Sequence, residues 1–223
     1  MVNEKPEWES VVRELGLLYP DARCELNFAN PFQLLVATIL SAQCTDVRVN
    51  EVTARLFGKY KSAHDLVSAE QPVLEEEIRS LGLFRHKARN ILALCRVLCE
   101  RFAGEVPRTI EELMELPGVG RKTASVVVNN AFGVPALAVD THVFRVARRL
   151  GWAHGKTPLV VELELRRMLP PALWGAVHHL LIWHGRRVCF ARSPACGMCL
   201  LQVVCPSARH DSFHCTNTTQ GVK

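Results

Sequence analysis

Four cysteines near the C-terminus have the spacing of metal-binding thiols. Cys189, Cys196, Cys199 and Cys205 follow the pattern Cys-x6-Cys-x2-Cys-x5-Cys within 17 residues. Thiolates this close together repel one another unless a cation lies between them, so the pattern predicts a metal site. One Cys-x2-Cys pair flanked by single cysteines suits the corners of an iron–sulfur cubane, whereas zinc prefers two such pairs. The spacing favours one [4Fe–4S] cluster, with zinc or unligated thiols as alternatives.

A glycine-containing turn followed by a lysine could hold an anion. The sequence LPGVGRK at 116–122 joins a helix expected at 109–116 to one that begins near 121. Gly118 and Gly120 permit positive φ angles and leave the turn without side chains, which exposes the first backbone N–H groups of the second helix. Two helices joined by such a hairpin can hold a DNA phosphate without reading sequence. The alternatives are an ordinary packing corner and, for Lys122, a phosphate-binding surface lysine.

A carboxylate and an imidazole stand at the expected start of another helix. Asp140 and His142 belong to the sequence VDTH at 139–142. Aspartate is a favoured N-cap residue, so capping is one interpretation of Asp140. The second interpretation is a carboxylate that also faces a catalytic site. His142, taken alone, is more often a packed or surface residue than a catalyst.

The charge is unevenly distributed along the 223 residues. The net charge is +5, but residues 1–115 carry 14 lysines and arginines against 18 acidic residues, a net of −4. Residues 116–223 carry 13 against 4, a net of +9. A basic half indicates a polyanionic partner such as nucleic acid, or merely a basic surface. We see no secretory leader and no transmembrane stretch, so we expect a cytoplasmic protein without a membrane partner.

The elements that must position these residues are helical. Asn30-Pro31 predicts the start of a buried helix over PFQLLVATILSA, and residues 86–102 place Ile91, Cys95 and Cys99 on one apolar face. Thr109 and Glu112 suggest a capping box, while Gly133 and Gly151 end their helices. The pattern predicts an all-α protein with a boundary near residue 134. The polar tail 214–223 is expected to fray.

Three motifs in this order resemble the endonuclease III family, helix–hairpin–helix DNA glycosylases with an iron–sulfur cluster. They are LPGVGRKTA, VDTHVFRV about 18 residues later, and the cysteine pattern. ELNFANPFQLLVATILSAQCTDVRVN and SLGLFRHKARNI are also similar to that family, so the resemblance covers about residues 7–206. It implies a two-domain helix–hairpin–helix glycosylase fold, with a six-helix barrel at 24–134 and a cluster domain formed by 1–23 and 135–223.

The resemblance also implies an activity. The enzyme would be a bifunctional DNA glycosylase and AP lyase of base excision repair that removes oxidised pyrimidines. Lys122 would attack the sugar and form a Schiff base, after which β-elimination cuts the strand. Partial burial or nearby positive charge would lower the pKa of its amine. Asp140 would stabilise the developing positive charge.

Further residues acquire roles by the same resemblance. The target base must leave the stack, and Gln43 and Leu83 would fill the gap that it leaves. Asp46 and His142 would line the lesion pocket, although Asp46 could instead stabilise the following helix. The remaining DNA contacts would come from Gly118, Val119, Gly120, Arg121 and Arg192. The partner would be double-stranded DNA with damaged bases or abasic sites, bound by a monomer.

The chain departs from the family pattern in three places. Arg192 is the one cation between Cys189 and Cys196, where the family usually has a further lysine. Cys44 stands where a small alanine is usual, and Ser125 replaces a common asparagine. Two other functions compete with this one. A relative that excises mismatched adenine would lack the hairpin lysine, and a DNA-binding or redox-sensing protein would lack a working Lys122–Asp140 pair.

Overall fold

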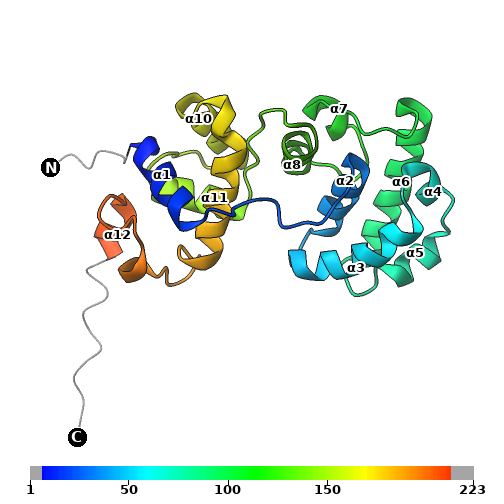
Figure 1. Ribbon diagram of the computed structural model, residues 1–223, viewed down its shortest axis with the longest axis horizontal. Coiled ribbons are helices and arrows are strands. Elements are labelled where there is room, and N and C mark those ends of the chain that lie inside the picture. The colour runs from blue at the N-terminus through cyan, green and yellow to red at the C-terminus, as the bar shows by residue number, and fades with distance from the viewer. Residues whose placement is uncertain (1–6, 212–223) are drawn as a thin grey trace, which may run out of the picture. The chain divides into compact units, whose positions relative to one another are not determined.

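The computed structural model describes residues 7–211, with side chains described up to residue 208, and every regular element in that range is a helix (Figure 1). The all-α expectation is therefore confirmed, and the tail at 214–223 lies outside the described residues. The α-helices are α1 (Trp8–Leu18), α2 (Pro31–Leu40), α3 (Asp46–Lys59), α4 (Ala63–Val67), α5 (Gln71–Glu77), α6 (Phe84–Phe102), α7 (Ile110–Met114), α8 (Arg121–Phe132), α9 (Thr141–Arg149), α10 (Pro158–Met168), α11 (Trp174–Arg187) and α12 (Pro206–Asp211). Two 3₁₀ turns are η1 (Pro171–Leu173) and η2 (Cys196–Met198).

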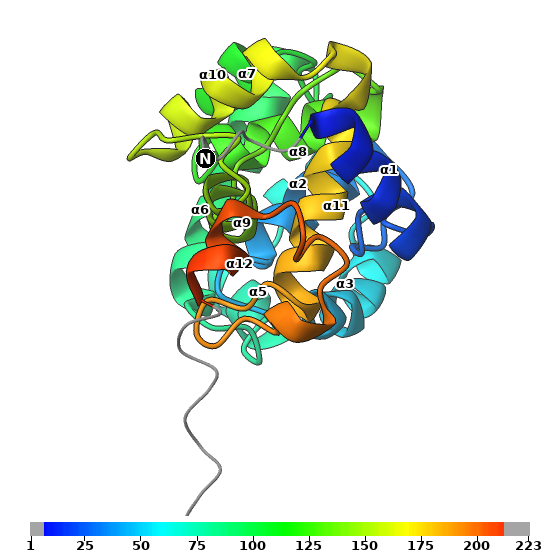
Figure 2. The same cartoon turned by 90° about the vertical axis from the view of Figure 1, so that its left-hand side faces the viewer.

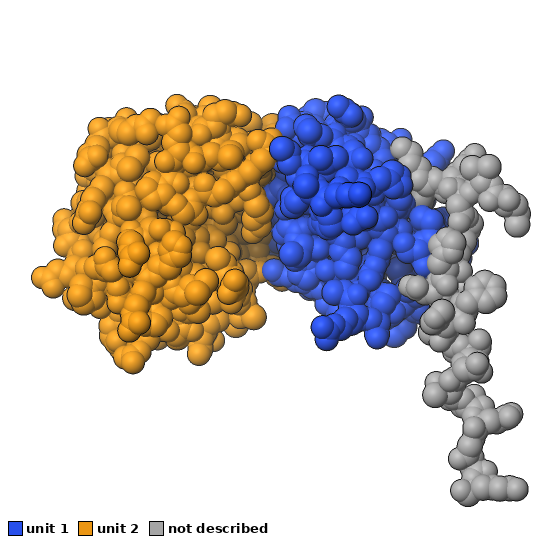
Figure 3. Space-filling model, turned by 180° about the vertical axis from the view of Figure 1, so that it is seen from behind, with its two compact units in different colours: residues 1–23, 137–223 blue, residues 24–136 orange. Residues whose placement is uncertain are grey.

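The chain forms two compact units, which Figure 3 shows in different colours. Unit 1 comprises residues 1–23 and 137–223, and unit 2 comprises residues 24–136. The sequence placed the second boundary after residue 134, whereas the units divide after residue 136. This boundary falls in an extended segment that follows Gly133, whose φ of +66° ends α8.

Unit 2 is built around α2. Eight of its ten residues are buried, and it packs against α3, α6 and α8. Pro31 fits the first helical turn, where its missing N–H costs nothing, and the Asn30 side chain accepts a 2.9 Å hydrogen bond from the Gln33 N–H. A helix that is apolar on all sides must be surrounded by other helices. The sequence prediction of a buried helix here is confirmed.

Helix α6 supplies a second wall of the same core. Ile91, Cys95 and Leu98 are fully buried, as their helical spacing predicts. Cys99 differs from the prediction, because it is only partly buried and its Sγ lies 3.4 Å from His64 Nδ1. Cys99 lies one helical turn after Cys95, and at this point the thiol meets α4 at the edge of the core.

The predicted capping box at α7 forms only in part. The Glu112 N–H donates to Thr109 Oγ1 at 3.2 Å, but the Glu112 carboxylate accepts from the Thr109 hydroxyl at 2.7 Å. The capping box with both reciprocal bonds lies at α4, between Ser62 and Asp65. A hydroxyl can donate and accept at once, which is why the Thr109 side chain takes both bonds.

Unit 1 is centred on α11, which packs against α1 and α9. Nine of its 14 residues are buried, including three histidines. His178 Nδ1 lies 2.8 Å from the Ala138 carbonyl, and His184 Nδ1 lies 3.3 Å from the Tyr19 hydroxyl. These bonds join α11 to α1 and to the segment before α9. None of the helices in residues 7–211 is long and apolar enough to cross a membrane.

The buried histidines predict acid sensitivity in unit 1. Burial, with His178 beside it, lowers the pKa of His179 to about 3, whereas an unfolded histidine titrates near 6.5. Below pH 6.5 the unfolded chain therefore binds more protons, and stability falls as the pH drops toward 3. The slope from this group approaches about 1.4 kcal/mol per pH unit. Chemical denaturation followed by tryptophan fluorescence from pH 7 to 4 measures this slope. His179→Gln should flatten it, and an unchanged slope would contradict this assignment.

Candidate active site and cysteine cluster

The turn between α7 and α8 contains one glycine that the backbone requires and one that it does not. Gly118 has φ +79°, and a Cβ there would lie 2.9 Å from Asn90 Nδ2. Gly120 has φ −93° and caps α8 without a side-chain hydrogen bond, and a Cβ there would meet nothing within 4 Å. Positive φ is therefore a property of Gly118 alone, contrary to the expectation for both. The bare N-cap at Gly120 leaves the first N–H groups of α8 open to an anion.

The hairpin divides its side chains between core and solvent. Val119 is buried in the unit 2 core, so its backbone is the part that can meet a ligand. Arg121 is half-buried and Lys122 is exposed, both on the first turn of α8. The partial burial expected for Lys122 is therefore absent from the described structure. Its amine stands in solvent at the positive end of a 12-residue helix.

Gln43 and Leu83 share an uncommon backbone conformation. Gln43 has φ +56° and Leu83 has φ +60°, and both side chains are exposed. The left-handed region costs a non-glycine residue about 1–2 kcal/mol. Neither the sequence pattern nor the capping of the helices requires the left-handed conformation at these two residues. Ala103 and Ser193 also have positive φ, and such strain at a non-glycine residue is often found at functional positions.

The charges of Asp46 and Lys122 both act on Cys24, a residue without a signal in the sequence. Burial raises the pKa of the Cys24 thiol, and the Asp46 charge raises it further while the Lys122 charge lowers it. Both charges are therefore close enough to act on Cys24. Asp46 is also the first residue of α3, whose N-cap is Thr45, so it stabilises the helix start as well. No spacing signal marks Cys24, because its position depends on the packing of unit 2.

Asp140 is the N-cap of α9. Its Oδ1 accepts hydrogen bonds from the N–H groups of His142 and Val143, both at 2.8 Å. The capping interpretation is therefore confirmed. Both bonds use the same oxygen, so Oδ2 remains available for a substrate. Capping and catalysis are compatible because they use different oxygens of one half-buried carboxylate.

His142 is held in its neutral form beside Asp140. Burial lowers its pKa, Asp140 raises it, and Arg145 and Arg186 lower it again. Arg145 Nη2 lies 3.1 Å from His142 Nδ1, and a guanidinium can only donate. Nδ1 therefore accepts, which assigns the ring proton to Nε2. This histidine is a packed residue on α9 with one face toward Gly185 of α11.

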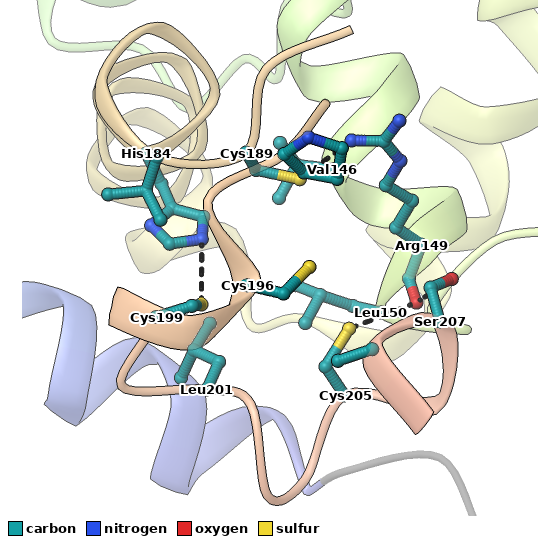
Figure 4. Close-up of a pocket in the computed structure, with 13 residues that line it drawn as sticks. Val146, Arg149, Leu150, His184, Cys189, Cys196, Cys199, Leu201, Cys205 and Ser207 are labelled. Carbon is teal, nitrogen blue, oxygen red and sulfur yellow. Dashed lines mark hydrogen bonds between the residues drawn. The ribbon is translucent and has the colours of Figure 1, made fainter. Parts of the chain in front are cut away.

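The four clustered cysteines line one hollow in unit 1 (Figure 4). Cys189 follows α11, Cys196 begins η2, Cys199 follows η2 directly and Cys205 precedes α12. Figure 2 brings this orange and red part of the chain into view. The remaining walls are mostly apolar, from residues such as Val146, Leu150 and Leu201. Residues at or beside the ends of α11, η2 and α12 thus place their thiols around a common space.

Two arginines of α9 hold the cysteine loop, and the sequence analysis missed both. Arg149 Nη1 donates to Cys189 Sγ at 3.2 Å and to the Phe190 carbonyl at 2.6 Å. Arg145 Nε donates to the Cys189 carbonyl at 3.0 Å. Their i, i+4 spacing in THVFRVARR puts both on one helix face, which is the signal that could have found them. His184 Nε2 lies 3.6 Å from Cys199 Sγ on the opposite wall (Figure 4).

The donor set fits a polynuclear cluster. No disulfide joins any of the eight cysteines in the described residues. Nor do three Cys, His, Asp or Glu side chains in the described range converge closely enough for one metal ion. Four thiols around a common hollow give a cubane the donor set that it needs, one sulfur for each of its four irons. Arg149 supplies positive charge beside them, as thiolates require.

The departures from the family pattern have distinct surroundings. Arg192 is exposed in the loop between Cys189 and Cys196, where Ser193 has φ +50°. Ser125 is buried on α8, and its hydroxyl has no hydrogen-bond partner within the described residues. Cys44 is partly buried, and its Sγ lies 3.3 Å from the Nζ of Lys87. Lys87 is 4% exposed and is a further residue without a sequence signal.

Comparisons with known proteins agree with this geometry. Residues 36–171 match the HhH-GPD superfamily of base excision DNA repair proteins. The chain belongs to this superfamily. Within it, the chain belongs with the endonuclease III proteins. It is 50% identical to endonuclease III of Bacillus subtilis (strain 168) over 206 aligned residues. The alignment covers 92% of this chain and 94% of that protein. Endonuclease III of Synechocystis sp. is 48% identical over 210 residues, or 94% and 96% of the two chains.

Solved structures extend the family assignment to the fold. A trapped endonuclease III–DNA covalent intermediate has a TM-score of 0.89, with 50% identity over 94% of this chain and 99% of that chain. A thermostable thymine-DNA glycosylase shares the fold, with a TM-score of 0.80 and 24% sequence identity. The match covers 91% of this chain and 96% of that chain. The helix–hairpin–helix glycosylase fold is therefore confirmed. As a member of the endonuclease III family, the chain is a base excision repair enzyme with DNA glycosylase and AP lyase activity.

The two hairpin glycines should respond oppositely to the same substitution. Gly118→Ser forces a side chain into the left-handed region and against Asn90, so it should lower the free energy of unfolding by about 1–3 kcal/mol. Gly120→Ser enters open space at an N-cap, where serine is favoured, and should leave stability unchanged or raise it by about 0.5 kcal/mol. Denaturant titration measures both values. Equal losses in the two variants would refute this distinction.

Proposed function

We propose that the enzyme removes oxidised pyrimidines from double-stranded DNA through a Schiff base at Lys122 and then cuts the strand by β-elimination. One observation carries the proposal: a lysine stands exposed on the first turn of α8, behind a hairpin whose N–H groups are open to a phosphate. The solved relative caught as a covalent intermediate with DNA supports the same chemistry for this chain. A covalent adduct requires a nucleophile that can reach the sugar.

The proposed attack uses the lone pair of the Lys122 amine. Its nitrogen bonds to C1′ of the sugar while the glycosidic bond breaks and the base leaves with the bonding electrons. Opening of the sugar ring gives the imine. Loss of a proton from C2′ then expels the 3′ phosphate, which is the lyase step. Exposure at the hairpin gives the amine access to a nucleotide that has left the stack.

Asp140 stabilises the positive charge that develops on the sugar. Its Oδ1 is fixed by two N–H groups of α9, which holds the carboxylate in one orientation without using Oδ2. A carboxylate fixed before the reaction costs no reorganisation when charge appears. Oδ2 is also suited to assist the proton transfers.

Other residues bind the DNA. Gln43 and Leu83 fill the gap in the duplex, which their exposed, strained positions support. The N–H groups behind Gly118, Val119 and Gly120 hold a phosphate, with Arg121 and Arg192 adding charge. Asp46 and His142 line the lesion pocket. The effect of both the Asp46 and the Lys122 charge on the Cys24 thiol supports the role of Asp46.

We further propose that Cys189, Cys196, Cys199 and Cys205 hold one [4Fe–4S] cluster. Base excision involves no net oxidation or reduction, so the cluster, when bound, would supply structural order to the loop that carries Arg192. Arg145 and Arg149 hold the same loop by hydrogen bonds to its carbonyl groups. The surroundings of the thiols, with Arg149 on one side and apolar walls on the others, support this assignment.

The enzyme acts as a monomer on DNA in the cytoplasm, associated with the nucleoid if the host is prokaryotic. All proposed catalytic and DNA-binding residues come from one chain, so the chemistry needs no second copy. A protein that binds DNA without base chemistry would leave lesion-bearing duplexes uncut. A panel of duplexes with single lesions, scored for base release and strand cleavage, decides between these functions and gives the lesion spectrum.

Removing the Lys122 amine should abolish the covalent intermediate. Wild-type enzyme treated with borohydride on lesion DNA should give a protein–DNA adduct on a denaturing gel. Lys122→Gln should give none, while its binding to the same duplex persists because other residues hold the DNA. Lys156→Gln, at an exposed lysine of unit 1, is the matched control and should trap normally. Trapping that survives in Lys122→Gln would show that another amine reacts.

Asp140→Asn separates capping from catalysis. The amide oxygen can accept the same two N–H bonds, so the melting temperature should hardly change. The lost charge should slow base release by about 10²–10³-fold in single-turnover assays. Asp140→Ala should lose both the rate and about 1 kcal/mol of stability. Normal base release by Asp140→Asn would mean that the carboxylate only caps α9.

The cluster assignment predicts the colour and the metal content of the purified protein. It should be brown, with about four irons and four sulfides per chain. Replacing any of the four cysteines by serine should lower soluble yield, because cluster binding and folding are coupled. Cys95→Ser, at a buried thiol of unit 2, should keep the full iron content. Colourless protein with one tightly bound zinc would disprove the assignment.

A further inference from the structure

Cys44 and Lys87 form a contact that the proposed base chemistry does not use. Lys87 Nζ lies 3.3 Å from Cys44 Sγ, and the lysine is 4% exposed. Within the described residues this sulfur is the one hydrogen-bond partner of the amine. A buried ammonium with three donors is poorly satisfied by a thiol, which is a weak acceptor. An oxygen atom on Sγ would give it a stronger one.

The pair joins the two segments that carry the proposed DNA-inserting side chains. Cys44 directly follows Gln43, whose φ is +56°. Lys87 lies one turn after Leu83, and its backbone N–H donates to the Leu83 carbonyl at 3.0 Å. Lys87 therefore contacts the Leu83 segment through its backbone and the Gln43 segment through its side chain. Because Cys44 is bonded directly to Gln43, a chemical change at its Sγ can alter the position of Gln43.

We propose that Cys44, paired with Lys87, is a peroxide-sensitive modification site that controls the Gln43 segment. One oxygen of hydrogen peroxide bonds to Sγ as the O–O bond breaks. The sulfur loses two electrons, and the released hydroxide takes the thiol proton and leaves as water. The product is the Cys44 sulfenic acid, whose oxygen accepts from Lys87 Nζ. Cys44 is partly buried, which admits a small oxidant.

The surroundings of the other cysteines in unit 2 make Cys44 the favoured target. Burial raises the pKa of the Cys24 thiol and raises that of Cys95 to about 12, which disfavours the reactive thiolate at both positions. Cys99 contacts His64 rather than a lysine. Lys87 Nζ lies 3.3 Å from Sγ, so an oxygen added to Sγ has a donor beside it. Cys44 directly follows Gln43, so a shift of Cys44 that accommodates this oxygen would also displace Gln43.

The chemical test needs no enzyme activity. Cluster-containing enzyme is exposed to hydrogen peroxide with dimedone, a reagent specific for sulfenic acids, and its peptides are mapped by mass spectrometry. Cys44 should label before any other cysteine, and Lys87→Met should reduce its labelling about tenfold because the paired positive charge is lost. Lys61→Met, at an exposed lysine, is the control and should label as wild type. Wild-type labelling in Lys87→Met, preferential labelling of Cys99, or a Cys24–Cys44 disulfide would overturn the proposal.

The functional consequence rests on the proposed function, and a second assay separates the two. Peroxide doses that leave the visible absorbance of the cluster unchanged should slow single-turnover base release about 10–100-fold. Dithiothreitol should restore the rate, and Cys44→Ala should keep its rate in peroxide. An equal loss in Cys44→Ala would overturn control through Cys44. Absence of base release before any peroxide would instead disprove the proposed function, while the dimedone result would still stand.

Discussion

The burial of α2 on all sides is the constraint on which the unit 2 site depends. An apolar helix without a solvent face must be surrounded, and α3, α6 and α8 surround it. Each of these three helices begins at a proposed functional position. Asp46 opens α3, Leu83 precedes α6 and Lys122 lies in the first turn of α8. Packing around one helix therefore fixes three otherwise independent segments.

Helix starts recur at the functional positions because they offer unsatisfied N–H groups and partial positive charge. The α8 start is left bare by Gly120 and can take a phosphate. The α9 start is instead closed by Asp140, whose carboxylate uses one oxygen for the cap. The same local physics thus accounts for the proposed anion site in one unit and the fixed anionic group in the other.

Helix α9 joins two functions within unit 1. Its N-terminus carries Asp140, and its C-terminal turns carry Arg145 and Arg149, which hold the cysteine loop. Arg145 also donates toward His142, the residue that Asp140 caps. Side chains on one rigid helix keep their relative positions, so order in the cysteine loop and orientation of the carboxylate rest on a common element. Helix α9 packs against α11, where Gly185 lies against His142 and Arg145.

The sequence by itself determined the elements and most of the chemistry. Features that depend on residues close together in the chain were predictable. They are the all-helical fold, the buried α2, the helix ends at Gly133 and Gly151, the Asp140 cap and the four clustered cysteines. It could not distinguish Gly118 from Gly120, because their φ angles follow from how α7 and α8 pack. Nor could it show that Lys122 is exposed.

Tertiary structure alone decided the contacts between distant segments. Three such sets of residues are 22 to 98 positions apart in the sequence. They are Cys24 with Lys122 and Asp46, Arg149 with Cys189, and Lys87 with Cys44. No periodicity or spacing encodes such pairs, because they form only when helices from separate parts of the sequence pack together. The left-handed backbone at Gln43 and Leu83 was hidden for the same reason: local preference opposes it, and the surrounding packing imposes it.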